Sequence, residues 1–135
     1  MQDIMSAVYV TLVADTAAGG VSTLVGGRIH EIQAGEDPTL PYVVTTLTSD
    51  APRITLTTDK VDSEIAIDII GNTNDGIATL RTIGERVFTV LNRQSLAISN
   101  AGFTGVCNLN CLGRGLPTLE ADEYRIMQSY RAQLI

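Results

Sequence analysis

The chain opens with a helical pattern of apolar residues. Near the N-terminus they recur at spacings of three and four, which places them on one face of a helix. The stripe consists of Ile4, Ala7, Val8, Thr11 and Leu12. Gly19 and Gly20 follow and are expected to end this helix. Residues 21–25 then make one short turn before a second glycine pair.

Alternation of apolar and polar residues predicts the strands. It is clearest in residues 64–70, where Ile65, Ile67 and Ile69 alternate with Glu64, Ala66 and Asp68, so one face should be buried. Further strands are expected at residues 28–33, 42–49, 96–99, 103–112 and 124–134. The segment "QAGEDPTLP" is expected to be a loop, because its glycine and two prolines do not fit a paired strand.

A second amphipathic helix is expected over residues 75–92, with Asn74 or Asp75 in "GNTNDG" available to cap it. Its apolar side carries Ile77, Leu80, Ile83, Val87, Phe88 and Leu91. We expect this helix to cover the alternating strand in one core. That core should contain Ile65, Ile67, Ile69, Ile83, Val87 and Phe88.

This order of elements predicts an α+β fold. Residues 1–135 should form a single domain, an antiparallel or mixed β-sheet flanked by two helices. One segment departs from short connections: residues 50–63 form a polar bridge of 14 residues with a possible strand at 54–57. Because it combines apolar residues with both charge signs, we predict that it is an assembly surface, mobile in an isolated subunit and ordered after assembly.

Charge and composition exclude several classes of protein. The chain has 135 residues, 15 acidic against 9 basic side chains and a net charge of −6, which disfavours a nonspecific nucleic-acid binder. There is no tryptophan, so material for base stacking is scarce. No apolar run approaches a membrane span and no signal peptide is recognised, so a cytosolic product without a membrane partner is expected.

Candidate chemistry is sparse. Cys107 and Cys111 are predicted to share one face of a strand as buried, reduced residues, about 13 Å apart. The only histidine, His30, is better explained by a solvated or interface position than by general-base catalysis. The glycine pairs lack the Lys-Ser/Thr of a phosphate loop. We therefore expect no catalytic residue, no metal site and no cofactor.

Acidic residues gather in "TDKVDSE" and "EADE", but neither matches a calcium loop. Solvated loops explain both clusters, and so do ion pairs between subunits. The candidate partners in such pairs are Arg53, Lys60, Arg114 and Arg125.

The segments in order resemble the tail completion, or tail terminator, proteins of long-tailed bacteriophages. The resemblance rests on "LVGGRIHE", "LPYVVTTLTSD", "SEIAIDIIGNTNDGIATLRTIGERVFTVLN" and "DEYRIMQSYRAQL", and it covers essentially the whole chain. The sharpest local matches are Gly27-Arg28-Ile29 and Leu40-Pro41-Tyr42. The bridge over residues 51–62 is longer and richer in threonine than the resemblance leads us to expect.

The resemblance implies a non-enzymatic virion protein that is assembled in the bacterial host cytoplasm. Its subunits would form a homo-oligomeric ring, usually a hexamer, that caps the tail tube and joins it to the head. Its partners would be other copies of itself, the tail tube protein and a head–tail connector protein, with DNA only passing through the lumen. The candidate subunit interface comprises Glu36, Asp37, Arg53, Ile54, Leu56, Asp59, Lys60, Val61 and Asp62.

Two alternatives remain open. One is another neck or head-closure subunit, or a component of a phage-derived injection device. The other, from a different class, is a small α+β enzyme or ligand-binding domain that uses His30 with an acidic partner. The mass in solution separates them, because a ring favours the structural class and a compact dimer with a pocket at His30 favours the enzyme.

Overall fold

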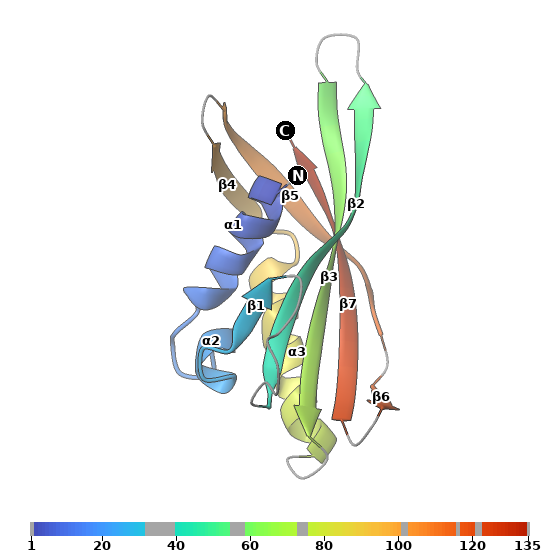
Figure 1. The fold of residues 1–135 in the computed structure, drawn as a ribbon. Helices are drawn as coiled ribbons and strands as arrows, with labels where there is room; N and C mark the ends of the chain where they lie inside the picture. The colour runs from blue at the N-terminus through green and yellow to red at the C-terminus, as the bar shows by residue number, and fades with distance from the viewer. Residues whose placement is uncertain are drawn as a thin grey trace.

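A computed structural model describes residues 2–31, 40–54, 59–72, 76–100, 103–115, 117–120 and 123–134. Within these residues three helices and seven strands follow one another (Figure 1). The helices are α1 (Gln2–Val13), α2 (Val21–Leu24) and α3 (Gly76–Leu91). The strands are β1 (Ile29–Glu31), β2 (Tyr42–Ile54), β3 (Asp59–Asn72), β4 (Ser95–Asn100), β5 (Phe103–Arg114), β6 (Thr118–Glu120) and β7 (Glu123–Leu134).

The strands form one mixed sheet. Its order is β1-β2-β3-β7-β5-β4, and the short β6 pairs with β7 beside this path. β1 is parallel to β2, whereas the remaining pairs are antiparallel. The expected α+β fold with an antiparallel or mixed sheet is therefore confirmed. β6 is an additional strand that the sequence did not predict, because three residues are too few to show a period of two.

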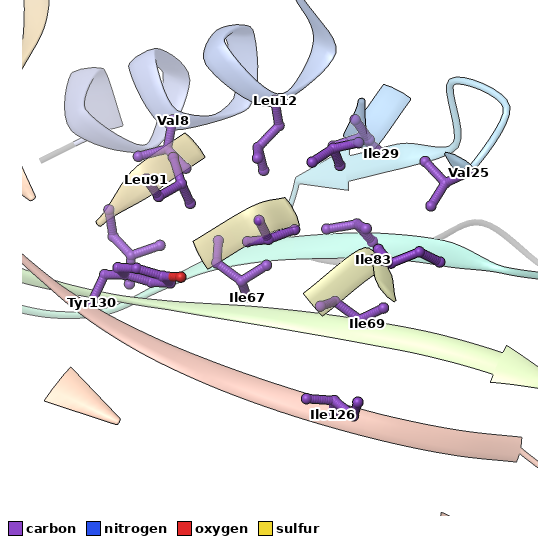
Figure 2. Packing of buried hydrophobic residues seen from close by; sticks show 14 of the residues in the cluster. Val8, Leu12, Val25, Ile29, Ile67, Ile69, Ile83, Leu91, Ile126 and Tyr130 are labelled. Carbon is purple, nitrogen blue, oxygen red and sulfur yellow. The ribbon is translucent and has the colours of Figure 1, made fainter. Parts of the chain in front are cut away.

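The helices lie on one side of the sheet, and the main core fills the space between them (Figures 1 and 2). Val8 and Leu12 of α1 are 1% and 0% exposed, which confirms the amphipathic stripe predicted for the first helix. They face the apolar side of β3, where Ile65, Ile67 and Ile69 are buried as their alternation predicted. β7 adds Ile126, Tyr130 and Ala132 to the same core.

Helix α3, the second amphipathic helix of the prediction, packs on this face through a narrower apolar stripe than predicted. Leu80, Ile83, Val87 and Leu91 are fully buried. Phe88 was expected to join them, and that prediction was wrong, because its side chain is only partly buried. One residue after Val87 turns by about 100° around a helix, so Phe88 lies at the margin of the stripe. There its ring contacts the guanidinium of Arg114, 4.1 Å from the ring centroid.

A buried polar network also joins α3 to the sheet. The Gln128 side chain is 1% exposed and its Nε2 donates to the carbonyl oxygen of Gly84 at 2.8 Å. The Tyr130 hydroxyl donates to Gln128 Oε1 at 2.5 Å, and burial raises the pKa of this phenol. A Cβ at Gly84 would lie 3.3 Å from Gln128 Nε2, so the glycine permits close packing of α3 on β7.

A second polar contact fixes the connection between the first two helices. Asp15 accepts bonds from Nε and Nη2 of Arg86, both at 2.8 Å, and from the backbone N–H of Val21. The hydrogen bond from Arg86 is the main reason that the pKa of Asp15 is lowered, although burial opposes it. Asp15 therefore joins the end of α1, the start of α2 and the middle of α3.

The cysteine prediction holds only in part. The register places Cys107 opposite Leu134 and Cys111 opposite Tyr130, on one face of β5. Cys111 is a free thiol that packs against the main core but is half-buried rather than buried. The burial of Cys107 lies outside what the structure describes.

Candidate assembly surface

The predicted bridge over residues 50–63 is mostly strand, so its interpretation as a long connection was wrong. β2 continues to Ile54 and β3 begins at Asp59, with unbroken register from the pair Ser49–Glu64 to the pair Ile54–Asp59. An extra residue between Leu47 and Ser49 shifts the register and interrupts the alternation. This β-bulge obscured the strand in the sequence. The suggested strand at 54–57 is confirmed only at Ile54, because residues 55–58 lie outside the described residues.

The end of this hairpin extends past the neighbouring strand. β3 is paired with β7 as far as Asp62 opposite Gln133, whereas its pairing with β2 continues to Asp59. We call residues 52–54 and 59–61 the β2–β3 arm. In Figure 1 the arm and the β4–β5 hairpin separate above the end of β7, so the sheet forks at this end.

Most of the predicted interface residues are in or next to this arm. Arg53 and Ile54 are the last residues of β2. Asp59, Lys60, Val61 and Asp62 are the first four of β3. The predicted residues Leu56, Glu36 and Asp37 lie outside the described residues. The structure thus brings six of the predicted residues together at one end of the sheet.

The outer edge of β2 is protected against pairing with another strand. β1 pairs with Val43, Val44 and Thr45, so from Thr46 onward no described strand lies on this side. The bulge after Leu47 and the proline at position 52 both disrupt a regular edge. The arm is therefore better suited to contacts through side chains than to strand addition.

The opposite end of the sheet has its own hairpin. β6 and β7 pair from Thr118–Arg125 to Glu120–Glu123, and this β6–β7 end lies away from the arm in Figure 1. Leu119 of β6 is 60% exposed, a high value for a large apolar side chain. Of the cluster "EADE", Glu120 is the last residue of β6 and Glu123 the first of β7, and Ala121 and Asp122 lie outside the described residues.

A further exposed surface surrounds Arg114 at the end of β5. The sequence suggested Arg114 only as a partner in ion pairs between subunits and did not reveal the apolar residues beside it. Three hollows of about 430, 360 and 470 Å³ border this residue. Arg114 lies against Phe88 and pairs with Glu85 at 2.8 Å, while Leu112 and Met127 nearby are 47% and 45% exposed. Arginine, methionine and aromatic residues are enriched in protein interfaces. Met127 could have been found, because it occupies a polar position in the alternation of β7.

The two sharpest local motifs contact each other. Arg28 Nε donates to the carbonyl oxygen of Pro41 at 2.9 Å, and the backbone N–H of Val43 donates to the carbonyl oxygen of Arg28 at 3.0 Å. Gly26 and Gly27 precede Arg28 with φ of 61° and 76°, which favours glycine. These motifs hold β1 beside β2 and have a structural role.

The described neighbour of the His30 ring is aromatic. The ring of His30 packs edge to face against Tyr42, with centroids 5.9 Å apart. Within the described part of the chain, no hydrogen bond joins this ring to a carboxylate. Asp68 lies on the same face of the sheet as His30. Its Oδ2 is 3.8 Å from Nη2 of Arg125, and burial raises the pKa of the Asp68 carboxyl. Among the described residues no group of three His, Cys, Asp or Glu side chains could hold a metal ion.

The described helices also include none that is long and apolar enough to cross a membrane. The described residues present three surfaces: an arm at one end of the sheet, an exposed hairpin at the other and an apolar patch around Arg114.

Comparison with known proteins gives one family. A family model described as "Tail completion protein gp17" matches residues 6–133. This match confirms the resemblance to phage tail completion proteins and, with it, the expected location in a virion. No curated protein sequence matches the chain.

Solved structures share the fold. A chain from the virion of a native gene transfer agent particle is 23% identical, with a TM-score of 0.79, and the match covers 98% of this chain and 95% of that chain. A second solved chain, whose name states no function, is 12% identical with a TM-score of 0.67 and coverage of 100% and 96%. At these identities the likeness concerns the fold.

Proposed function

The chain belongs to the tail completion protein gp17 family, and on that premise we propose that it is a ring-forming tail terminator subunit. As a member of that family it is a structural protein of a phage tail. The proposed ring is a homo-hexamer that caps the tail tube and joins it to the head through a connector protein, with DNA passing through its lumen. Residues 1–135 would act as one tail-terminator-like domain.

The observation that supports this proposal most directly is the β2–β3 arm. The arm extends the β2–β3 pairing beyond the last β3–β7 pair. No described strand continues the sheet beyond β3 at these residues, so a contact with another subunit could take that place. A closed ring needs two different patches on each subunit, and the arm would be one of them.

The charge of the chain is consistent with this role. A net charge of −6 disfavours adhesion to the phosphate backbone, which suits a channel wall that DNA must pass. The likeness to a chain of a gene transfer agent virion supports the fold of a particle subunit and adds no detail of partners. No specific observation favours an enzyme that uses His30, whose ring packs against Tyr42.

Shortening the arm tests the proposal. Residues 53–60 would be replaced by Asn-Gly, which can join Pro52 to Val61, Cα partners in the present register. We expect a folded monomer that no longer forms rings in mass photometry and no longer completes tails in an assembly assay. A matched control replaces Arg131, an exposed residue of β7 outside the arm, by Ala. Rings of normal mass and infectious particles from the shortened variant would contradict the proposal.

A further inference from the structure

We infer that the outward side of helix α1 in one copy packs on the uncovered face of the sheet in the next copy, beside Met127. This contact rests on the proposed self-assembly and is separate from any contact of the β2–β3 arm. It joins two exposed apolar surfaces of the same subunit. Among the described residues four large apolar side chains are exposed, and three of them, Val10, Leu112 and Met127, belong to these two surfaces.

Helix α1 lacks the charged outward side of an ordinary surface helix. Residues 4–14 contain no charged side chain. Val10 is 61% exposed and stands two residues from both Val8 and Leu12, so it points about 160–200° away from these core residues. Ser6 and Ala14, about one turn to either side of Val10, are also exposed. We call Ser6, Val10 and Ala14 the α1 strip.

Helix α3 gives the contrast within the same molecule. It packs on the same face of the sheet, but its outward side is polar, as is usual for a surface helix. The exposed residues there include Arg81, Thr82, Glu85 and Thr89. Water is a suitable neighbour for that side of α3. The α1 strip, in contrast, could be covered without removing any charged group from water, so its burial would be favourable.

The receiving surface lies on the face of the sheet that is turned away from the helices. Met127 and Ser129 alternate along β7 with Gln128, which bonds to α3, so both lie on the opposite face. Together with Leu112 and Gly113 they border a hollow of about 470 Å³. A Cβ at Gly113 would meet no described atom within 4 Å, so the space above this residue is open. Small residues and an adaptable methionine thus surround the hollow.

The two surfaces fit each other in shape. In the α1 strip one larger side chain, Val10, stands between the small residues Ser6 and Ala14. Val10 would enter the hollow, and the small residues would leave room for Met127 and Leu112 at its margin. These two side chains are 45% and 47% exposed in the single subunit, so they have apolar surface to bury.

The partner is a second copy of this chain, because the two surfaces face in opposite directions. Helix α1 lies on one face of the sheet and Met127 on the other, so Val10 cannot reach Met127 of its own chain (Figure 1). Every copy carries one strip and one hollow. A head-to-tail contact buries both, and this heterologous type can close into a ring. The charged residues that border the hollow, Glu64 and Arg114, would lie at the polar rim.

Opposite charges placed on the two surfaces test the inference. One variant carries Val10→Glu and the other carries Met127→Lys. Both positions are exposed, so each variant should fold, and thermal unfolding checks this. In the assembly each would place an unpaired charge against an apolar surface. We expect the concentration at half-assembly, measured by mass photometry, to rise by about tenfold or more.

Mixing the two variants gives a sharper outcome. In a ring where they alternate, half of the contacts pair the introduced carboxylate with the introduced ammonium group. The other half pair the unaltered Val10 with the unaltered Met127. An equimolar mixture should therefore assemble again, with an even copy number. Native mass spectrometry with one variant isotope-labelled measures this alternation, which an effect on folding could not produce.

Matched controls separate this contact from the effect of total charge. Thr89→Glu and Thr89→Lys make the same two changes in net charge on the exposed side of α3, and they should leave assembly within about twofold of the original. Equal losses in the controls would overturn the inference. Normal assembly of either variant would also overturn it, as would a mixture that does not recover.

Two further outcomes separate this inference from the proposed function. Variants that form normal rings but do not complete tails would show that a different protein covers these surfaces, and the inference would be wrong. If the unaltered chain forms no ring at any concentration, the proposed function itself fails. If it forms rings that ignore the substitutions at Val10 and Met127, only this inference fails.

Discussion

Strand β3 passes through two different environments. From Ser63 to Ile70 it lies between β2 and β7, and its odd-numbered residues Ile65, Ile67 and Ile69 are almost fully buried under the helices. From Asp59 to Val61 its described strand neighbour is β2 alone. The same backbone conformation therefore serves the core over most of the strand and an extension at its first three residues. Strand pairing alone does not distinguish these two segments, whereas their neighbours do.

The largest effect on the free energy of unfolding is expected in the part of β3 that the helices cover. Ile67 is 0% exposed, so Ile67→Ala should lower the free energy of unfolding by about 2–5 kcal/mol, through lost burial and a residual cavity. Urea denaturation followed by circular dichroism measures it. A loss below about 1 kcal/mol would contradict the assignment of this half to the core.

The second-largest effect on stability is expected where α3 packs closely against β7. Gly84→Val places methyl groups where a Cβ alone already comes within 3.3 Å of Gln128 Nε2. Overpacking and disturbance of the Gln128 bond to Gly84 should cost about 1–3 kcal/mol. Thermal unfolding measures the change, with Thr82→Val on the exposed side of α3 as the control. An unchanged melting temperature would show that the helix can move away without loss.

The margin of the covered face should respond less than its centre. Phe88 is partly buried and stacks on Arg114, so Phe88→Ala should cost about 1–2 kcal/mol rather than the larger loss of a buried aromatic residue. Ile83→Ala, at a fully buried position of the same helix, is the matched comparison. If both substitutions cost the same in urea denaturation, Phe88 belongs to the core after all.

Asp15 predicts a pH dependence with a defined sign. Because hydrogen bonds from Arg86 lower the pKa of Asp15 below 3.8, the ionised carboxylate stabilises the fold above that pH. This contribution is lost as the pH falls through the lowered pKa. Asp15→Asn should therefore cost about 1 kcal/mol near neutral pH, and the difference from the unaltered chain should shrink below pH 3.8. A difference that grows on acidification, in denaturant titrations at several pH values, would reverse the assignment.

The smallest effect on stability is expected in the arm. Ile54→Ala should change the free energy of unfolding by no more than about 0.5 kcal/mol in the monomer, because β3 has no β7 partner at this level. The same substitution should weaken assembly. A loss of unfolding free energy as large as that of Ile67→Ala would show that the arm belongs to the core, and the contrast between the two parts of β3 would then be wrong.

Sequence patterns identified the helices and strands that bury one regular face. Val8 and Leu12 marked the first helix, and the alternating isoleucines marked the buried half of β3, because burial on one face requires a regular spacing. The periodic pattern is absent from elements that are irregular or very short. At the β2 bulge one extra residue breaks the period, and β6 is too short to have one.

The sequence by itself determined the fold class, the covered face of the sheet, the absence of a recognisable catalytic motif and the resemblance to the family. The first three follow from local spacing and composition, whereas the resemblance rests on the segments quoted for it. Only the tertiary structure decided that the pairing of β2 with β3 continues past the last β3–β7 pair and that Phe88 meets Arg114 at the margin of the core. Register and neighbours are relations between distant segments, and no local pattern of residues encodes them.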